Sequence, residues 1–156
     1  MYFLEHLTHK RLMNLKIIDE HGRPVYLIKE SSALFTKIAS MKDQYRNEVA
    51  KIRQIPGITP AYIISSQEAE FKVVQKFSLK PRFVIKNSAY EIKGLIYDTD
   101  YEVMWRDHAV LHCWREMHKG KYIQKIDILE HKYEIEALAI VITVESSKRS
   151  LFMTRV

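Results

Sequence analysis

The chain is poor in cysteine, glycine and proline, and these shortages limit what it can be. Cys113 is the only cysteine in 156 residues, so no disulfide bond can form within the chain and a disulfide-stabilised secreted scaffold is excluded. There are only four glycines and four prolines, and no stretch rich in Gly, Pro or Ser could serve as a linker. We therefore expect a single domain over residues 1–156.

Long apolar runs are also missing. Charged residues and histidines interrupt residues 1–15, so the uninterrupted apolar core of a signal peptide is lacking and we expect a cytoplasmic protein. The most apolar stretch, Ala137 to Val144, is bracketed by Glu136 and Glu145. A membrane-spanning helix needs about 20 apolar residues, which is more than twice this length. Any membrane contact would therefore be peripheral.

The composition is that of an ordinary folded domain, with 47% hydrophobic and 28% charged residues. A chain of this length buries roughly two thirds of its unfolded surface, so it needs no disulfide or metal for stability. The formal net charge of +6 favours association with anionic partners such as lipid headgroups, nucleic acid or acidic proteins. A positive net charge of this size indicates association with anionic partners and gives no information about catalytic activity.

Apolar and polar residues alternate along most of the chain. Within residues 48–54, two apolar residues alternate with Lys51 and Arg53, and the same period of two occurs in residues 90–94 and 101–106. This period is typical of antiparallel strands with one buried face. Polar turn residues separate such segments. The pattern predicts twelve strands, near residues 2–7, 14–19, 24–29, 34–42, 47–54, 60–66, 69–77, 82–86, 90–96, 100–106, 108–117 and 122–128.

The segment from Ala137 to Val144 can be interpreted in two ways. Its last five residues are β-branched, which favours a strand. A closed barrel of twelve strands, however, is wide enough to leave an interior that needs apolar material, and this is the only segment that is apolar on all sides. A helix from Glu134 to Ser147 would be roughly 21 Å long, comparable to the height of such a barrel. These arguments alone leave strand and helix both open.

The charges around this segment match the dipole of a helix. Glu134 and Glu136 would lie in its first turn, and Lys148 and Arg149 would follow its last turn.

The order of these segments resembles that of the LURP-one-related proteins, which are grouped with the tubby C-terminal domain and the phospholipid scramblases. The resembling stretches are "LKIIDEHGRPVYLIKE", "MKDQYRNEVAKIRQ", "AEFKVVQKF", "YEIKGLIYDTDYEV" and "EALAIVITVESS", which begin at Leu15, Met41, Ala69, Tyr90 and Glu136. The resemblance implies a mainly β fold, a closed and mostly antiparallel barrel of about twelve strands around a buried hydrophobic C-terminal helix. The tail from Arg149 to Val156 extends past this pattern, either as an extra strand or as a free end.

Signatures of catalysis and metal binding are absent from the sequence. There is no Gly-rich phosphate loop, no CxxC pair and no HExxH helix. His112 and Cys113 are neighbours on a predicted strand, so their side chains should point to opposite faces. The same alternation separates Cys113 from His108. We expect no enzymatic activity, no cofactor and no metal.

The most distinctive charged cluster is "KVVQKFSLKPRFVIK", where Lys76, Lys80 and Arg82 flank the apolar pair Phe77 and Leu79. A basic rim around an apolar tip is what contact with an anionic membrane requires, and each basic residue contributes on the order of 1 kcal/mol. The candidate contacts for anionic lipid are Lys76, Lys80, Arg82, Lys119 and Lys121. A hairpin with a solvated basic face is the plainer alternative.

The sequence thus predicts a non-enzymatic binding or adaptor module of uncharacterised role. The tubby relatives bind phosphoinositides and the scramblase relatives act on membranes, so the resemblance implies recognition of anionic lipid or phosphoinositide headgroups. A protein-interaction or structural scaffold without lipid binding is the alternative. Nucleic acid is disfavoured, because Tyr62 and Phe83 are predicted to face the core rather than to stack on bases.

Overall fold

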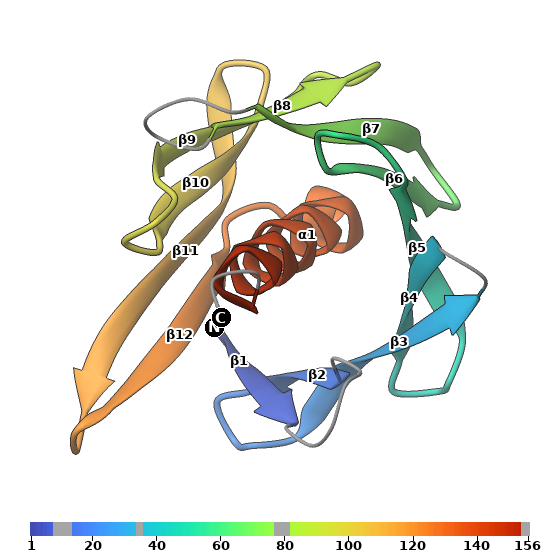
Figure 1. The fold of residues 1–156 in the computed structure, drawn as a ribbon. Helices are drawn as coiled ribbons and strands as arrows, with labels where there is room; N and C mark the ends of the chain where they lie inside the picture. The colour runs from blue at the N-terminus through green and yellow to red at the C-terminus, as the bar shows by residue number, and fades with distance from the viewer. Residues whose placement is uncertain (8–13, 34–35, 77–81, 154–156) are drawn as a thin grey trace.

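The computed structural model describes residues 1–7, 14–33, 36–76 and 82–153, which form twelve strands and a C-terminal helix (Figure 1). The strands are β1 (Tyr2–Leu7), β2 (Asn14–Asp19), β3 (Pro24–Ala33), β4 (Thr36–Asp43), β5 (Glu48–Ile55), β6 (Ala61–Ser66), β7 (Glu70–Lys76), β8 (Arg82–Lys86), β9 (Tyr90–Leu95), β10 (Asp100–Trp105), β11 (His108–His118) and β12 (Lys121–Ile128). A 3-10 turn (His131–Tyr133) leads into α1 (Glu134–Met153).

The strands form one antiparallel sheet that curves into a barrel. Each strand pairs with its neighbour in sequence from β1 to β8 and from β9 to β12, and β1 pairs with β12. The hydrogen-bonded order therefore begins at β8 and ends at β9, and these two strands are not paired with each other. The barrel is nearly closed, with one seam between β8 and β9.

All twelve predicted strands are confirmed, with shifts of a few residues at their ends. The largest difference is in β3, which was predicted to end at residue 29 but continues to Ala33. The reason is its pairing with β4, which runs without interruption from Tyr26↔Asp43 to Ala33↔Thr36. The predicted turn at Lys119 and Gly120 has φ angles of 49° and 76°. Two consecutive left-handed residues are typical of the tight turns that join twisted hairpin strands.

The segment from Ala137 to Val144 is helical and lies inside the barrel, as Figure 1 shows for α1. Every side chain from Ala137 to Val141 is completely buried. The inward-facing side chains of the wall, such as Ile17, Ile64 and Val103, belong to the same apolar core. Its β-branched residues therefore adopt a helix because the barrel interior must be filled, which outweighs their local preference for a strand.

The helix is longer than predicted, which corrects the expectation for the tail. It continues past Ser147 to Met153, so the part from Arg149 to Met153 is neither an extra strand nor a free end. No glycine or proline interrupts these residues, so nothing in the sequence stops the helix. Lys148 does not follow the last turn but lies within the helix. Residues 154–156 lie outside the described residues.

The alternation of strand direction defines two ends of the barrel. We call the end at which α1 begins the entry end; its connections are residues 20–23, 44–47, 67–69, 87–89, 106–107 and 129–133. The opposite end we call the far end; its described connections are residues 56–60, 96–99 and 119–120.

Candidate functional site

The predicted basic contacts that the structure describes all lie at the far end, but in two separate places. Lys76 ends β7, Arg82 begins β8, and the two residues pair in register. Lys119 and Lys121 lie at the tip of the β11–β12 hairpin and are exposed. In Figure 1 the β7–β8 pair lies at the top and the β11–β12 tip at the lower left, so the structure does not join them into one patch. Lys80 lies outside the described residues, as do Phe77 and Leu79.

The tip of the β11–β12 hairpin projects from the barrel (Figure 1). All residues from 115 to 122 are exposed, whichever face of the hairpin they occupy, so neither face packs on the core. Met117 and Tyr122 form a cross-strand pair and are 59% and 63% exposed. The guanidinium carbon of Arg115 lies 4.4 Å from the centroid of the Tyr122 ring. The tip thus combines exposed apolar and basic side chains.

The acidic residue of the tip, Glu116, is neutralised locally. The Nζ atom of Lys125 lies 2.6 Å from Oε2 of Glu116, and the indole N–H of Trp114 donates to Oε1 over 3.0 Å. Both hydrogen bonds lower the pKa of Glu116, and the one from Lys125 is the larger cause. The charges at the tip that lack an acidic partner among the described residues are those of Arg115, Lys119 and Lys121, so the tip is net positive.

Other exposed apolar side chains occupy the far end as well. Ile58 in the β5–β6 connection is 98% exposed, and Leu95 and Tyr97 lie exposed at the β9–β10 connection. Exposed hydrophobic residues of this size are unremarkable singly. Three others, Met1, Tyr45 and Leu129, are exposed at the entry end. The candidate membrane-facing surface is therefore defined by the basic and apolar tip of the β11–β12 hairpin, and not by exposed apolar residues alone.

At the entry end, hydrogen bonds fasten the first turn of α1 to the wall. The hydroxyl groups of Tyr2 and Tyr26 donate to the two carboxylate oxygens of Glu134, and a ring nitrogen of His131 lies 2.9 Å from Oε1. Burial, followed by the charge of Glu134, raises the pKa of Tyr2 to about 12. Burial also raises the pKa of Tyr26, with the hydrogen bond to Glu134 as the next cause. Both phenols therefore remain donors at neutral pH.

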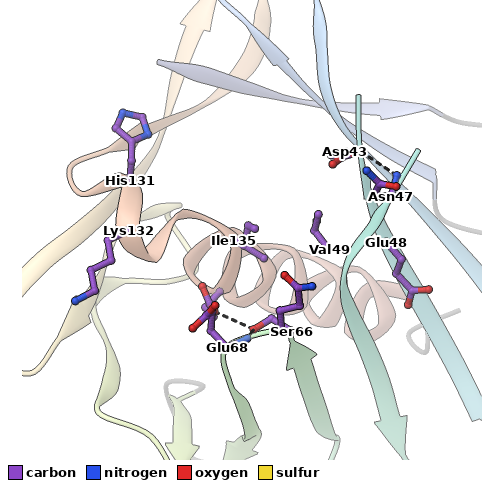
Figure 2. A pocket seen from close by; sticks show the side chains of 11 residues that line it. Asp43, Asn47, Glu48, Val49, Ser66, Glu68, His131, Lys132 and Ile135 are labelled. Carbon is purple, nitrogen blue, oxygen red and sulfur yellow. Dashed lines mark hydrogen bonds between the residues drawn. The ribbon is translucent and has the colours of Figure 1, made fainter. Parts of the chain in front are cut away.

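A cavity of about 560 Å³ opens beside this turn (Figure 2). It lies between the β4–β5 and β6–β7 connections and the start of α1. Its lining is mostly polar and includes four carboxylates, those of Asp43, Glu48, Glu68 and Glu136. No pattern in the sequence predicted this cavity. Its acidic residues come from three segments that are distant in sequence, the β4–β5 hairpin, the β6–β7 connection and the start of α1, so only the folded barrel brings them together.

A second polar cluster is sealed inside the barrel toward the far end. Tyr101 and Lys148 both donate to Oε1 of Glu145, over 2.9 and 2.8 Å, and Lys148 also donates to Thr99. The four side chains are buried. Because each charge has an opposite partner or a hydrogen bond, this cluster is a structural contact between wall and helix.

The predicted separation of Cys113 from its histidine neighbours is confirmed. Cys113 is fully buried and its sulfur accepts a hydrogen bond from Gln124, while His112 points outward with Nε2 2.8 Å from Asp100. Burial raises the pKa of the Cys113 thiol to about 12, so the thiolate does not form at neutral pH. His108 contacts Glu130 on the surface instead. In the described part of the chain, no group of three or more His, Cys, Asp or Glu side chains is arranged to hold a metal ion.

Together these observations define a class of protein, a nearly closed antiparallel β-barrel filled by an apolar C-terminal helix. The family model described as LURP-one-related matches residues 7–150, and the chain belongs to this family. No curated protein and no solved structure significantly matches the chain. Among the described residues, no helix has the length and apolarity to cross a bilayer.

Proposed function

We propose that this protein is a non-enzymatic binding or adaptor module of the cytoplasm, which recognises anionic lipid or phosphoinositide headgroups with its far end. The observation that carries this proposal is the projecting β11–β12 tip, where Lys119, Lys121 and Arg115 stand beside exposed Met117 and Tyr122. Peripheral membrane contacts use this combination, because basic groups bind headgroups while apolar and aromatic groups enter the interface.

The expected affinity is modest. Three basic residues contribute on the order of 3 kcal/mol near an anionic leaflet, at about 1 kcal/mol each. Burial of Met117 and Tyr122 in the interface would add to this, since a fully buried side chain of this size contributes about 1.5–3 kcal/mol. Lys76 and Arg82, elsewhere on the same end, would add a second contact. Binding should therefore be reversible and sensitive to salt.

A protein-interaction or structural scaffold is the second candidate, and the seam of the barrel favours it. The facing edges of β8 and β9 are not paired with each other. Unpaired strand edges can accept an extended segment of another protein as an added strand.

Flotation with liposomes separates these two functions. Purified protein would be mixed with vesicles of neutral lipid, of graded phosphatidylserine content, or with a phosphoinositide added, at rising salt concentrations. The variants are Lys121→Glu and Arg82→Glu. Lys86→Glu is the matched control, because Lys86 is also exposed but ends β8 at the entry end, and its replacement makes the same change in charge.

Lipid recognition predicts flotation with anionic vesicles that salt abolishes, that Lys121→Glu weakens several-fold, and that Lys86→Glu leaves nearly unchanged. Equal loss in all three variants would indicate attraction to net charge alone and contradict a specific surface. Absence of flotation at every composition would reject lipid binding and leave the scaffold function.

A further inference from the structure

The cavity at the entry end has the size and lining of a ligand site. Its volume of about 560 Å³ lies within the range of about 300–1,000 Å³ that is typical of small-molecule sites. Two apolar side chains, Val49 and Ile135, lie among its polar lining residues (Figure 2).

Glu136 is the least expected residue of this lining. It is only 6% exposed, yet its carboxylate receives just one hydrogen bond from the described residues, from the hydroxyl of Ser66 to Oε1 over 2.8 Å. The backbone N–H groups of Glu68 and Ala69 donate to the same hydroxyl oxygen, so Ser66 is held in place. Buried carboxylates are ordinarily paired with a cation or with several donors. Among the described residues, the second oxygen of Glu136 receives no hydrogen bond, and it is not sealed from solvent, so a donor from outside the chain can reach it.

The other charges of the cavity do not supply that donor. Among the described residues, none of Asp43, Glu68 and Glu136 forms an ion pair, and Glu48 has only a 3.6 Å contact with the exposed Lys51. Lys132 is the lysine of the lining, and its Nζ atom lies 5.5 Å from the centroid of the Tyr133 ring rather than against a carboxylate. The cavity is therefore net negative, although the whole chain is net positive.

From this geometry we infer that the cavity binds a primary ammonium group carried on an alkyl chain, with the ammonium at Glu136 and the methylene groups against Val49 and Ile135. Two sources share this chemistry, a free polyamine and a lysine side chain of a partner protein. An ammonium group carries a positive charge and three donors, which suits the carboxylate of Glu136 in a cavity of net negative charge. A single metal ion is disfavoured, because the carboxylates described here do not converge as metal ligands.

The test is titration calorimetry of the full chain with spermidine, with a tetralysine peptide and with magnesium chloride. The variants are Glu136→Gln and Glu68→Gln. Glu5→Gln is the control, because Glu5 is an exposed carboxylate of β1 away from the cavity, and its replacement makes the same charge change. Thermal melting monitors folding, and the exposed Glu68 keeps the test valid if Glu136→Gln does not fold.

Binding of spermidine, of tetralysine or of both supports the inference, and the preferred one identifies the source. Glu136→Gln should weaken binding about tenfold or more, since a hydrogen bond to a charged group is worth about 1.5–3 kcal/mol. Glu5→Gln should leave affinity unchanged, and magnesium should not compete at equal concentration. No binding of either amine, or equal loss in the control, would overturn the inference. Vesicle binding at the far end is a separate measurement and can fail independently.

Discussion

The hydroxyl group of Tyr101 on β10 donates a hydrogen bond to Glu145 of α1 across 2.9 Å, in a part of the barrel that is closed to solvent. The same carboxylate oxygen accepts from Lys148, whose ammonium lies 5.3 Å from the centroid of the Tyr101 ring. A polar contact thus holds an otherwise apolar helix at one position inside the wall. A buried charge that loses a partner is costly, so this contact makes a clear prediction.

Tyr101→Phe should lower the free energy of unfolding by about 1.5–3 kcal/mol, the usual value of a hydrogen bond to a charged group. The ring remains, so the loss reflects the hydroxyl. Urea denaturation measures it, with Tyr122→Phe as the control, because the exposed Tyr122 should change stability by less than about 0.5 kcal/mol. A Tyr101→Phe protein as stable as the control would show that the contact is energetically neutral.

Leu138 tests the helix as the filling of the barrel. Its side chain is completely buried, so Leu138→Ala should cost about 2–5 kcal/mol in the free energy of unfolding, through lost burial and the cavity left behind. Leu138→Met keeps the volume and should cost less than about 1.5 kcal/mol. Urea midpoints of the two variants give the comparison. Similar urea midpoints for the two variants would mean that a cavity at position 138 does not destabilise the protein, which would contradict the prediction.

Gly94 tests the close approach of β9 to β10. A Cβ atom there would lie 2.6 Å from the carbonyl oxygen of Asp100 and 2.8 Å from the Cα of Tyr101, and the φ angle is +122°. We expect Gly94→Ala to destabilise the protein by at least about 1–3 kcal/mol, the usual cost of a strained backbone position. Gly57→Ala is the control, since its nearest neighbour would be at 3.6 Å. Calorimetric melting temperatures that fall equally in both variants would contradict this account.

Cys113 predicts a pH dependence of stability. Its pKa is raised from 9.0 to about 12 in the folded protein, so above pH 9 the unfolded chain loses this proton first. The stabilisation is complete below pH 9 and declines as the pH rises toward 12, by up to about 1.4 kcal/mol per pH unit from this group. Urea denaturation between pH 7 and 11 should show a steeper decline in the wild type than in Cys113→Ala. Parallel curves would contradict the prediction.

The same thiol should also be chemically inert. A disulfide reagent should react with it at pH 8 far more slowly in the native protein than in urea, since burial blocks access and suppresses the thiolate.

The positions of the strands could be predicted from sequence because their signals are local. In β5 the alternation of Ala50 and Ile52 with charged neighbours indicates a half-buried strand without reference to any other segment. Lys119 and Gly120 mark a turn in the same way. The far-end lysines could also be identified as a charged cluster, although their separation into two places could not.

The prediction that Ala137 to Val144 form a helix depended on more than the residues of this segment. Ile140 to Val144 favour a strand locally, and only a barrel interior that needs filling makes them a helix. The end of α1 at Met153 was missed because the residues after Ser147 contain no stop signal, so the pattern alone gave no reason to place the end there.

By itself, then, the sequence determined twelve strands and their turns, because side-chain alternation and turn chemistry act over a few residues. The tertiary structure alone decided where Glu134 meets Tyr2 and Tyr26, that Tyr101 reaches Glu145, and that four carboxylates share a cavity. These contacts join segments tens of residues apart or more. Their geometry arises only when the sheet curves around the helix, so no pattern among neighbouring residues of the sequence encodes these contacts.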